Sequence, residues 1–392
     1  MLKKMGIGLM ASVLFLSGCF PFVQDTEDNV VDMGEEGDPQ EQEVGVVPQA
    51  STAENFYSSV LYDGTYIHGR TRGFGSAVVY NRADLDQLEL GLTEIAKEHF
   101  DPETYFFREG QFILRDELNS WLMRESDDNP NGLNPPLGKG DNMREREEDQ
   151  PRYLSHILEH NYLVEDNGEY KLGGIVIGLS MNSVYNFRVE DDQGRYNFYE
   201  TDISENKMLE EGEKIAQEVV NRLRSQERED GSFNDIPIVI ALFREQPRDS
   251  VIPGNFVATA VAEPDKELSG LQSINERYYL FPSDDANNNA RNDSDNFLRF
   301  REEVQGFFES YVGIVGKGYY RDNSLQELTI DVPIRYQGKT EIVALSQFIA
   351  DRIEQRFPKN IKVQVYINSV GEKQEAIVVR QPNEEPFIHI FR

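Results

Sequence analysis

The stretch Leu325–Tyr336, LQELTIDVPIRY, is the clearest structural signal in this chain of 392 residues. Its apolar side chains alternate with polar ones, which is the period of a strand with one buried face. The next stretch, Glu341–Phe357, has apolar residues three and four positions apart and predicts a helix that ends before Pro358. Alternation returns at Ile361–Ile367, and Ala376–Arg380 adds a further strand. The C-terminal part therefore predicts the order strand, helix, strand, strand.

The same order is predicted earlier in the chain. Leu172–Arg188 is predicted as a strand, Glu210–Gln226 as an amphipathic helix, and Ile236–Phe243 and Asn255–Ala262 as two further strands. Residue identity between the two stretches is poor, so only the pattern supports a duplicated unit. The expected fold class is α+β, with two domains, a strand–helix–strand–strand unit as the hypothesised repeat, and mainly antiparallel sheets.

The domain boundary is expected where the composition turns polar between these units. The run Asp284–Asn296 is predicted as a solvated loop, and its first residues lie in the region Leu271–Ala290, which we take as the boundary. We expect an N-terminal α/β domain over residues 56–270 and a C-terminal α/β domain over residues 271–392. Further predicted elements are a strand at Ser76–Tyr80, helices at Asp84–Phe100, Gln111–Arg124 and Asp295–Tyr311, and a long irregular segment at Glu125–Pro151.

The N-terminus has the pattern of an export signal. Lys3 and Lys4 precede an uncharged, mostly apolar run at residues 5–16, which is too short to span a bilayer but typical of a secretory signal. Leu16-Ser17-Gly18-Cys19 follows and resembles the lipobox of bacterial lipoproteins. We expect a signal peptide at residues 1–18, cleavage between Gly18 and Cys19, and a diacylglyceryl group with palmitate-type acyl chains on Cys19. The alternative is an ordinary secretory signal that leaves an unpaired thiol.

The lipidated cysteine is expected to begin a disordered acidic tether at residues 19–55. Phe20–Asn55 contains no Lys, Arg or His and shows no apolar periodicity. The prediction is a protein held on the extracellular face of the cell membrane by lipid alone, because two acyl chains give stable anchoring. Its expected partners are the membrane, through Cys19, and the lipoprotein-processing enzymes.

Charge and cysteine content exclude several classes of function. The formal net charge of −31 argues against binding nucleic acid and against docking on anionic lipid through a basic patch. The single cysteine leaves no disulfide, so packed cores must stabilise the fold. No cofactor is indicated, and no G-x-S-x-G motif occurs.

One motif has the spacing of a catalytic metal site. His156-Ile157-Leu158-Glu159-His160 matches H-x-x-E-H, and Arg152–Asn161 is predicted as a short helix. On a helix the two histidines share one face and could bind zinc, with Glu159 as general base. The same residues also fit a plain amphipathic helix or adventitious metal binding, because no third ligand is obvious.

A second motif resembles half of a calcium site. Asp127, Asn129, Asn131 and Gly132 match the start of an EF-hand loop, but the twelfth position is Gly138 instead of a glutamate. An Asx- and Gly-rich loop is therefore the preferred interpretation.

Two stretches carry a resemblance to a known family. Leu328–Ile334, LTIDVPI, with its following helix, and Asn129–Pro135, NPNGLNP, are similar to segments of the CamS family of Gram-positive lipoproteins. The lipobox, the acidic tether and the two-part body extend the resemblance over essentially the whole chain. The family is named for sex-pheromone precursors, which implies that the signal remnant carries the named activity. The candidate peptide is Ala11-Ser12-Val13-Leu14-Phe15-Leu16-Ser17-Gly18.

The functional hypothesis is thus a membrane-anchored extracellular lipoprotein whose signal remnant is the precursor of a hydrophobic pheromone peptide. Its folded body is expected to be a non-catalytic binding or interaction module with an unidentified ligand. The alternative is a surface zinc-dependent hydrolase that uses His156, Glu159 and His160. A structural envelope protein that contacts peptidoglycan is left open.

Overall fold

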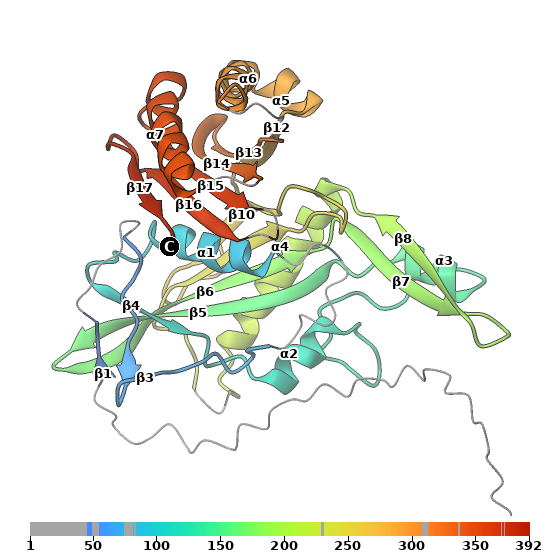
Figure 1. Cartoon of the computed structure of the whole chain (residues 1–392). Coiled ribbons are helices and arrows are strands. Elements are labelled where there is room, and N and C mark those ends of the chain that lie inside the picture. Colours follow the sequence, from blue (N-terminus) through green and yellow to red (C-terminus); the bar gives the residue numbers. More distant parts are fainter. Residues whose placement is uncertain are drawn as a thin grey trace, which may run out of the picture. The chain divides into compact units, whose positions relative to one another are not determined.

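The computed structural model describes residues 45–48, 55–73, 81, 84–228, 231–307, 313–335, 338–369, 371 and 373–392. The expected signal peptide, the lipobox, most of the tether and the strand expected at Ser76–Tyr80 lie outside these residues. The described part is α+β, and its strands form four mostly antiparallel sheets (Figure 1). The predicted fold class is confirmed.

A short sheet forms at the start of the described chain. It contains β1 (Gly45–Val46), β2 (Leu61–Tyr62) and β3 (Thr65–Tyr66), all antiparallel. β1 lies within the segment predicted to be a disordered tether, so that prediction is wrong for these two residues. The reason is backbone pairing, since Val46 pairs with Leu61 in β2.

The first large sheet has the strand order β11-β10-β9-β6-β5-β4. Only the neighbours β6 and β9 run parallel, and every other pair is antiparallel. The strands are β4 (Tyr105–Glu109), β5 (Leu154–Asp166), β6 (Glu169–Met181), β9 (Ile238–Arg244), β10 (Asn255–Ala262) and β11 (Gln272–Ser273).

The second large sheet repeats this plan. Its order is β12-β13-β14-β15-β16-β17, and only the third and fourth strands, β14 and β15, run parallel. Each parallel pair is joined through a helix and is followed by an antiparallel strand, so the predicted strand–helix–strand–strand pattern occurs in both sheets. The strands are β12 (Glu276–Phe281), β13 (Val315–Arg321), β14 (Ser324–Ile334), β15 (Lys362–Ser369), β16 (Gln374–Arg380) and β17 (Phe387–Ile390).

The connection after β6 differs from its predicted form. Instead of one strand over Leu172–Arg188, β6 ends at Met181 and the chain enters a separate hairpin of β7 (Val184–Glu190) and β8 (Tyr196–Asp202). Helix α4 (Glu205–Leu223) follows and leads to β9. Ser204 caps α4, because its side chain accepts a hydrogen bond from the main-chain nitrogen of Lys207.

Helices cover both faces of the first sheet. Buried residues of α2 (Arg115–Leu122) and α4 pack on one face, and those of α1 (Leu85–Ala96) form a separate cluster on the other. A β-carbon at Gly178 in β6 would lie 2.7 Å from Leu92 Cδ1, so glycine permits the close approach of α1. Helix α3 (Met143–Asp149) lies within the segment predicted to be irregular.

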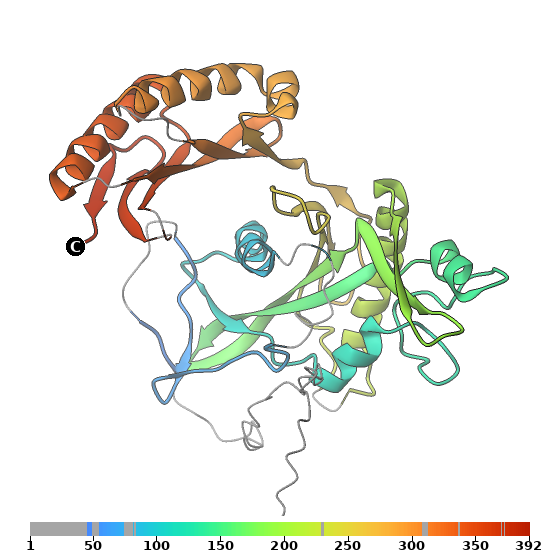
Figure 2. The same ribbon diagram turned by 45° about the vertical axis from the view of Figure 1, so that its right-hand side comes forward.

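Helices line one face of the second sheet (Figure 2), where α6 (Arg291–Gln305) and α7 (Lys339–Arg356) bury their apolar residues. Arg380 of β16 is fully buried beneath the end of α7. Its Nη1 donates to the main-chain oxygens of Ile353 at 3.3 Å and Phe357 at 3.4 Å. It therefore satisfies carbonyl groups that a helix C-terminus leaves without partners.

The region Leu271–Ala290 consists mostly of regular structure. β11 belongs to the first sheet and β12 to the second. The run predicted as a solvated loop, Asp284–Asn296, forms α5 (Asp284–Asn289) and the start of α6. Ser283 caps α5, because its side chain accepts a hydrogen bond from the main-chain nitrogen of Ala286. Ala286 itself is fully buried. The interpretation as a loop was wrong because the cap and the single alanine are a weak pattern. The division into two domains stays a prediction.

Candidate functional site

The residues proposed for lipidation and for pheromone release, Leu16–Cys19 and Ala11–Gly18, lie outside the described residues. The site that the structure describes is the H-x-x-E-H motif and its surroundings.

The prediction that Arg152–Asn161 forms a helix is wrong. His156, Glu159 and His160 lie on β5, which pairs with β6 over its whole length and with β4 near its end. A short apolar run fits a buried strand as well as a helix, and here the facing apolar run in β6 decides between them. The zinc-binding geometry expected from a helix is therefore absent.

Glu159 organises the neighbouring main chain. Its carboxylate is buried and accepts from the main-chain nitrogens of Gln111 at 3.0 Å, Phe112 at 3.1 Å and Ile113 at 2.7 Å. Asn161 Nδ2 also donates to it, at 2.6 Å. Burial raises the pKa of Glu159, while these donors act in the opposite direction. The carboxylate thus positions residues 111–113 and is not oriented as a general base.

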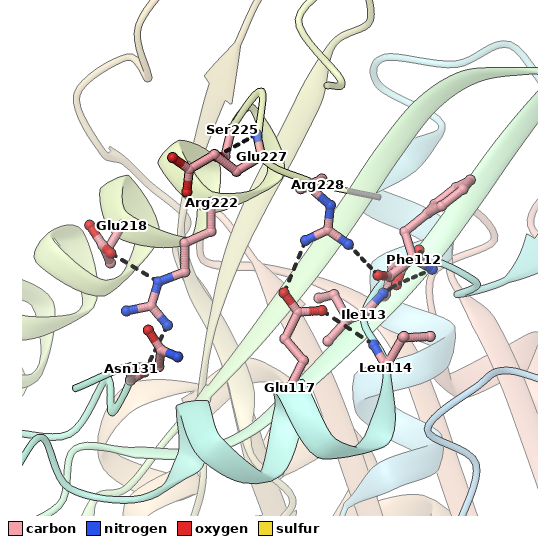
Figure 3. Close-up of polar contacts among 11 residues, drawn as sticks. Phe112, Ile113, Leu114, Glu117, Asn131, Glu218, Arg222, Ser225, Glu227 and Arg228 are labelled. Atoms are coloured by element: carbon pink, nitrogen blue, oxygen red, sulfur yellow. Dashed lines mark hydrogen bonds and ion pairs between the residues drawn. The ribbon is translucent and has the colours of Figure 1, made fainter. Parts of the chain in front are cut away.

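The same segment is held from its other side by α4 and the residues after it (Figure 3). Arg228 donates to the main-chain oxygen of Phe112 at 2.5 Å and pairs with Glu117 Oε1 at 3.0 Å. Arg222 donates to the main-chain oxygen of Asn131 at 2.7 Å and pairs with Glu218 at 2.9 Å. Two arginines therefore connect the end of α4 to α2 and to the loop after α2.

The two histidines have different surroundings. His160 is fully buried, and neither of its ring nitrogens has a hydrogen-bond partner among the residues that the structure describes. Its ring lies edge-on to that of Phe107, with the ring centroids 4.9 Å apart. Burial lowers its pKa to about 3 and that of His156 to about 4. Among the residues that the structure describes, no group of three or more His, Cys, Asp or Glu side chains could hold a metal ion.

His156 borders a buried polar cluster that the sequence pattern did not indicate. Ser180 Oγ donates to Glu245 Oε1 at 2.8 Å, and Asn81 Nδ2 donates to Oε2 at 3.1 Å. Burial raises the pKa of Glu245, and these donors oppose the shift. The serine contacts a carboxylate instead of a histidine, and the adjoining cavity has the size of about one water molecule. This arrangement has no room for an organic substrate.

The segment Asn129–Pro135 has a structural role. Asn134 is fully buried: its Nδ2 donates to the main-chain oxygens of Leu122 at 2.8 Å and Leu154 at 3.0 Å, and its Oδ1 accepts from Leu154 N at 2.9 Å. Asn129 bonds to Ser120 in α2. These side chains join α2 to the start of β5 and do not converge on an ion, which agrees with the Asx-rich loop.

The described residues define an α+β protein with two six-stranded sheets of the same strand order. The sequence model of the CamS sex pheromone cAM373 precursor matches residues 66–386, and the chain belongs to this family. The resemblance noted in the sequence is confirmed for the body, since the matched range begins after the predicted leader.

Solved structures similar to the chain include two with close to a third of their residues identical. A sex pheromone precursor from Lactobacillus salivarius subsp. salivarius UCC118 shares 31% identity with a TM-score of 0.78, covering 89% of this chain and 99% of that one. The C-terminal domain of the sex pheromone staph-cAM373 precursor from Staphylococcus aureus shares 29% identity with a TM-score of 0.67, covering 80% of this chain and 97% of that one. A comparison with curated proteins found no match. No helix in the described ranges is long and apolar enough to cross a membrane.

Proposed function

We propose that this member of the CamS family is an extracellular lipoprotein anchored to the cell membrane through Cys19. The observation that carries the proposal is Leu16-Ser17-Gly18-Cys19, directly after an apolar run, in a chain whose body belongs to a pheromone-precursor family. The acidic stretch that follows serves as a spacer, because its negative charges repel one another and anionic lipid.

Intact-mass measurement of the protein extracted from membranes tests the anchor. We expect a mature chain that begins at Cys19 and carries two or three acyl chains. Cys19→Ala removes the sulfur that accepts the lipid, so this variant should keep its signal peptide or be shed. An unlipidated wild-type chain that begins at another residue would contradict the proposal.

We further propose that the remnant Ala11–Gly18 is the precursor of a hydrophobic pheromone peptide. The support is the family to which the chain belongs and the apolar character of residues 11–16. A synthetic peptide of these eight residues should trigger a plasmid-transfer or aggregation response in responder cells at nanomolar to micromolar concentration. A scrambled peptide of equal composition is the control, and equal responses to both would rule the peptide out.

The body is proposed to be a non-catalytic binding module. The support is that its H-x-x-E-H motif lies on a buried strand, with Glu159 bonded to the main chain of residues 111–113. The residues of this motif therefore serve packing and main-chain positioning. We expect the body to bind its ligand at its surface.

A further inference from the structure

The hairpin of β7 and β8 has an unusual exposed side. Side chains at even positions of β8 point to one face, and all four of them are exposed. Phe198 is 77% exposed and Tyr196 is 49% exposed. These four side chains, which we call the outer row, are Tyr196, Phe198, Glu200 and Asp202.

The opposite face of the hairpin is fixed to the body. Phe187 stacks between Tyr185 and Tyr199, with ring centroids 5.3 and 5.6 Å apart. The α3 helix contacts both strands, Arg144 lies 4.5 Å from the ring of Tyr199, and Tyr185 donates to Glu147 at 2.8 Å. Figure 1 shows α3 beside the hairpin. The outer row is therefore presented on a rigid ribbon, which lowers the entropy cost of binding.

The edge of β8 is open to further pairing. In the described part of the chain β8 pairs only with β7, in a register without a bulge. Edge strands are normally protected by Lys, Pro, a bulge or a covering element. β8 contains no Lys and no Pro. On β7, Asn186 Nδ2 donates a hydrogen bond to Asn81 Oδ1 at 3.2 Å.

The charges of the hairpin indicate which kind of partner it can bind. Residues 184–202 contain five acidic and two basic side chains, and the whole chain has a net charge of −31. Arg188, which pairs opposite Phe198, lies 4.5 Å from the ring of Tyr196 and so covers the aromatic half of the outer row. The acidic half, Glu200 and Asp202, would repel a second copy of this chain and an anionic membrane.

We propose that β8 is a docking edge for an extended basic peptide segment of a partner protein. The segment adds as a strand beside β8, so that main-chain hydrogen bonds supply affinity. Its apolar side chains lie against Tyr196 and Phe198, and its Lys or Arg side chains pair with Glu200 and Asp202. The inference rests on the proposed role of the body as a binding module and names the surface and the ligand class.

The test uses the detergent-solubilised full-length chain and two fluorescent heptapeptides, Lys-Thr-Lys-Thr-Val-Thr-Val and its reverse. The two sequences allow for antiparallel and parallel addition. Fluorescence anisotropy should show saturable binding of one of them, and binding should weaken as salt rises. A peptide with Glu in place of Lys should not bind.

Variants locate the binding edge. Phe198→Ala should weaken binding about tenfold, and Glu200→Gln with Asp202→Asn should remove most of the salt dependence. Phe387→Ala is the matched control, because Phe387 is 64% exposed on the edge strand β17. Thermal unfolding should be the same for both phenylalanine variants, since both side chains are exposed.

Binding of neither peptide at millimolar concentration would overturn the proposal. Binding that is equal in wild type and Phe198→Ala would also overturn it, but would leave the body a binding module with its site elsewhere. Intact mass at Cys19 is independent of both results, so failure of the anchor is distinguishable from failure of the docking edge.

Discussion

Burying the charged form of His160 costs free energy, so this residue makes the stability of the fold depend on pH. In the described part of the chain neither ring nitrogen has a hydrogen-bond partner, and burial lowers the pKa of His160 to about 3 from an ordinary 6.5. The unfolded chain therefore binds more protons than the folded chain between these two values. Stability contributed by the neutral ring is fully present above pH 6.5 and is lost as the pH falls toward 3.

His160→Leu should flatten this pH dependence. Leucine stays apolar beside Phe107 at every pH, so the difference of up to one proton between the two states disappears. The slope of the unfolding free energy between pH 6.5 and 4 should fall by up to about 1.4 kcal/mol per pH unit. Urea unfolding across this range measures it. The exposed His389→Leu is the control, and an unchanged slope in His160→Leu would show that the ring is not neutral when folded.

The roles of these residues could not be predicted from their spacing. Positions 156 and 160 share a face in a helix and also in a regular strand, since four is a multiple of two. The main-chain donors to Glu159 lie 46 to 48 positions earlier in the chain. A motif within five residues holds no information about such distant main-chain donors, so the helix expected at Arg152–Asn161, on which the zinc alternative depended, was wrong.

At the scale of elements, Asn134 connects the end of α2 to the start of β5. Asn134→Ala removes the side-chain atoms that bond to three main-chain groups. The oxygens of Leu122 and Leu154 lose the donor Nδ2, and the nitrogen of Leu154 loses the acceptor Oδ1. We expect a loss of about 3 kcal/mol in the free energy of unfolding, measured by urea denaturation.

Asn131→Ala is the matched control for this prediction. Asn131 is exposed and contacts Arg222 through its main-chain oxygen, which the substitution keeps. Its effect should stay within about 0.5 kcal/mol. Equal losses in both variants would mean that the buried contacts of Asn134 contribute no more to stability than the exposed side chain of Asn131.

Elements with strong periodicity were predicted well. Asn255–Ala262 is confirmed as β10 with the same bounds, and the helices at α1, α2, α4, α6 and α7 lie within a few residues of their expected ranges. The hairpin after β6 was missed because Asn182-Ser183 is a weak turn signal between two apolar strands. Apart from Met143, α3 is polar, so it has no apolar face that could reveal it.

At the scale of the whole molecule, the two sheets share one strand order. The repeated sequence pattern predicted the individual strands and helices of this arrangement, because each strand and its crossover helix show local periodicity. The parallel pairing of β6 with β9 and of β14 with β15 could not be predicted, because it joins segments far apart in the sequence. The docking edge of β8 also depends on this topology, since pairing with a neighbour decides which strands are edges.

The two sheets share one strand order, but they should differ in how fast they form. Residues 182–237 separate β6 from β9, whereas residues 335–361 separate β14 from β15. A loop of about twice the length costs about 0.6 kcal/mol more to close. Contacts with the shorter separation form faster. When the whole chain refolds from denaturant, the second sheet should therefore reach its native pairing before the first.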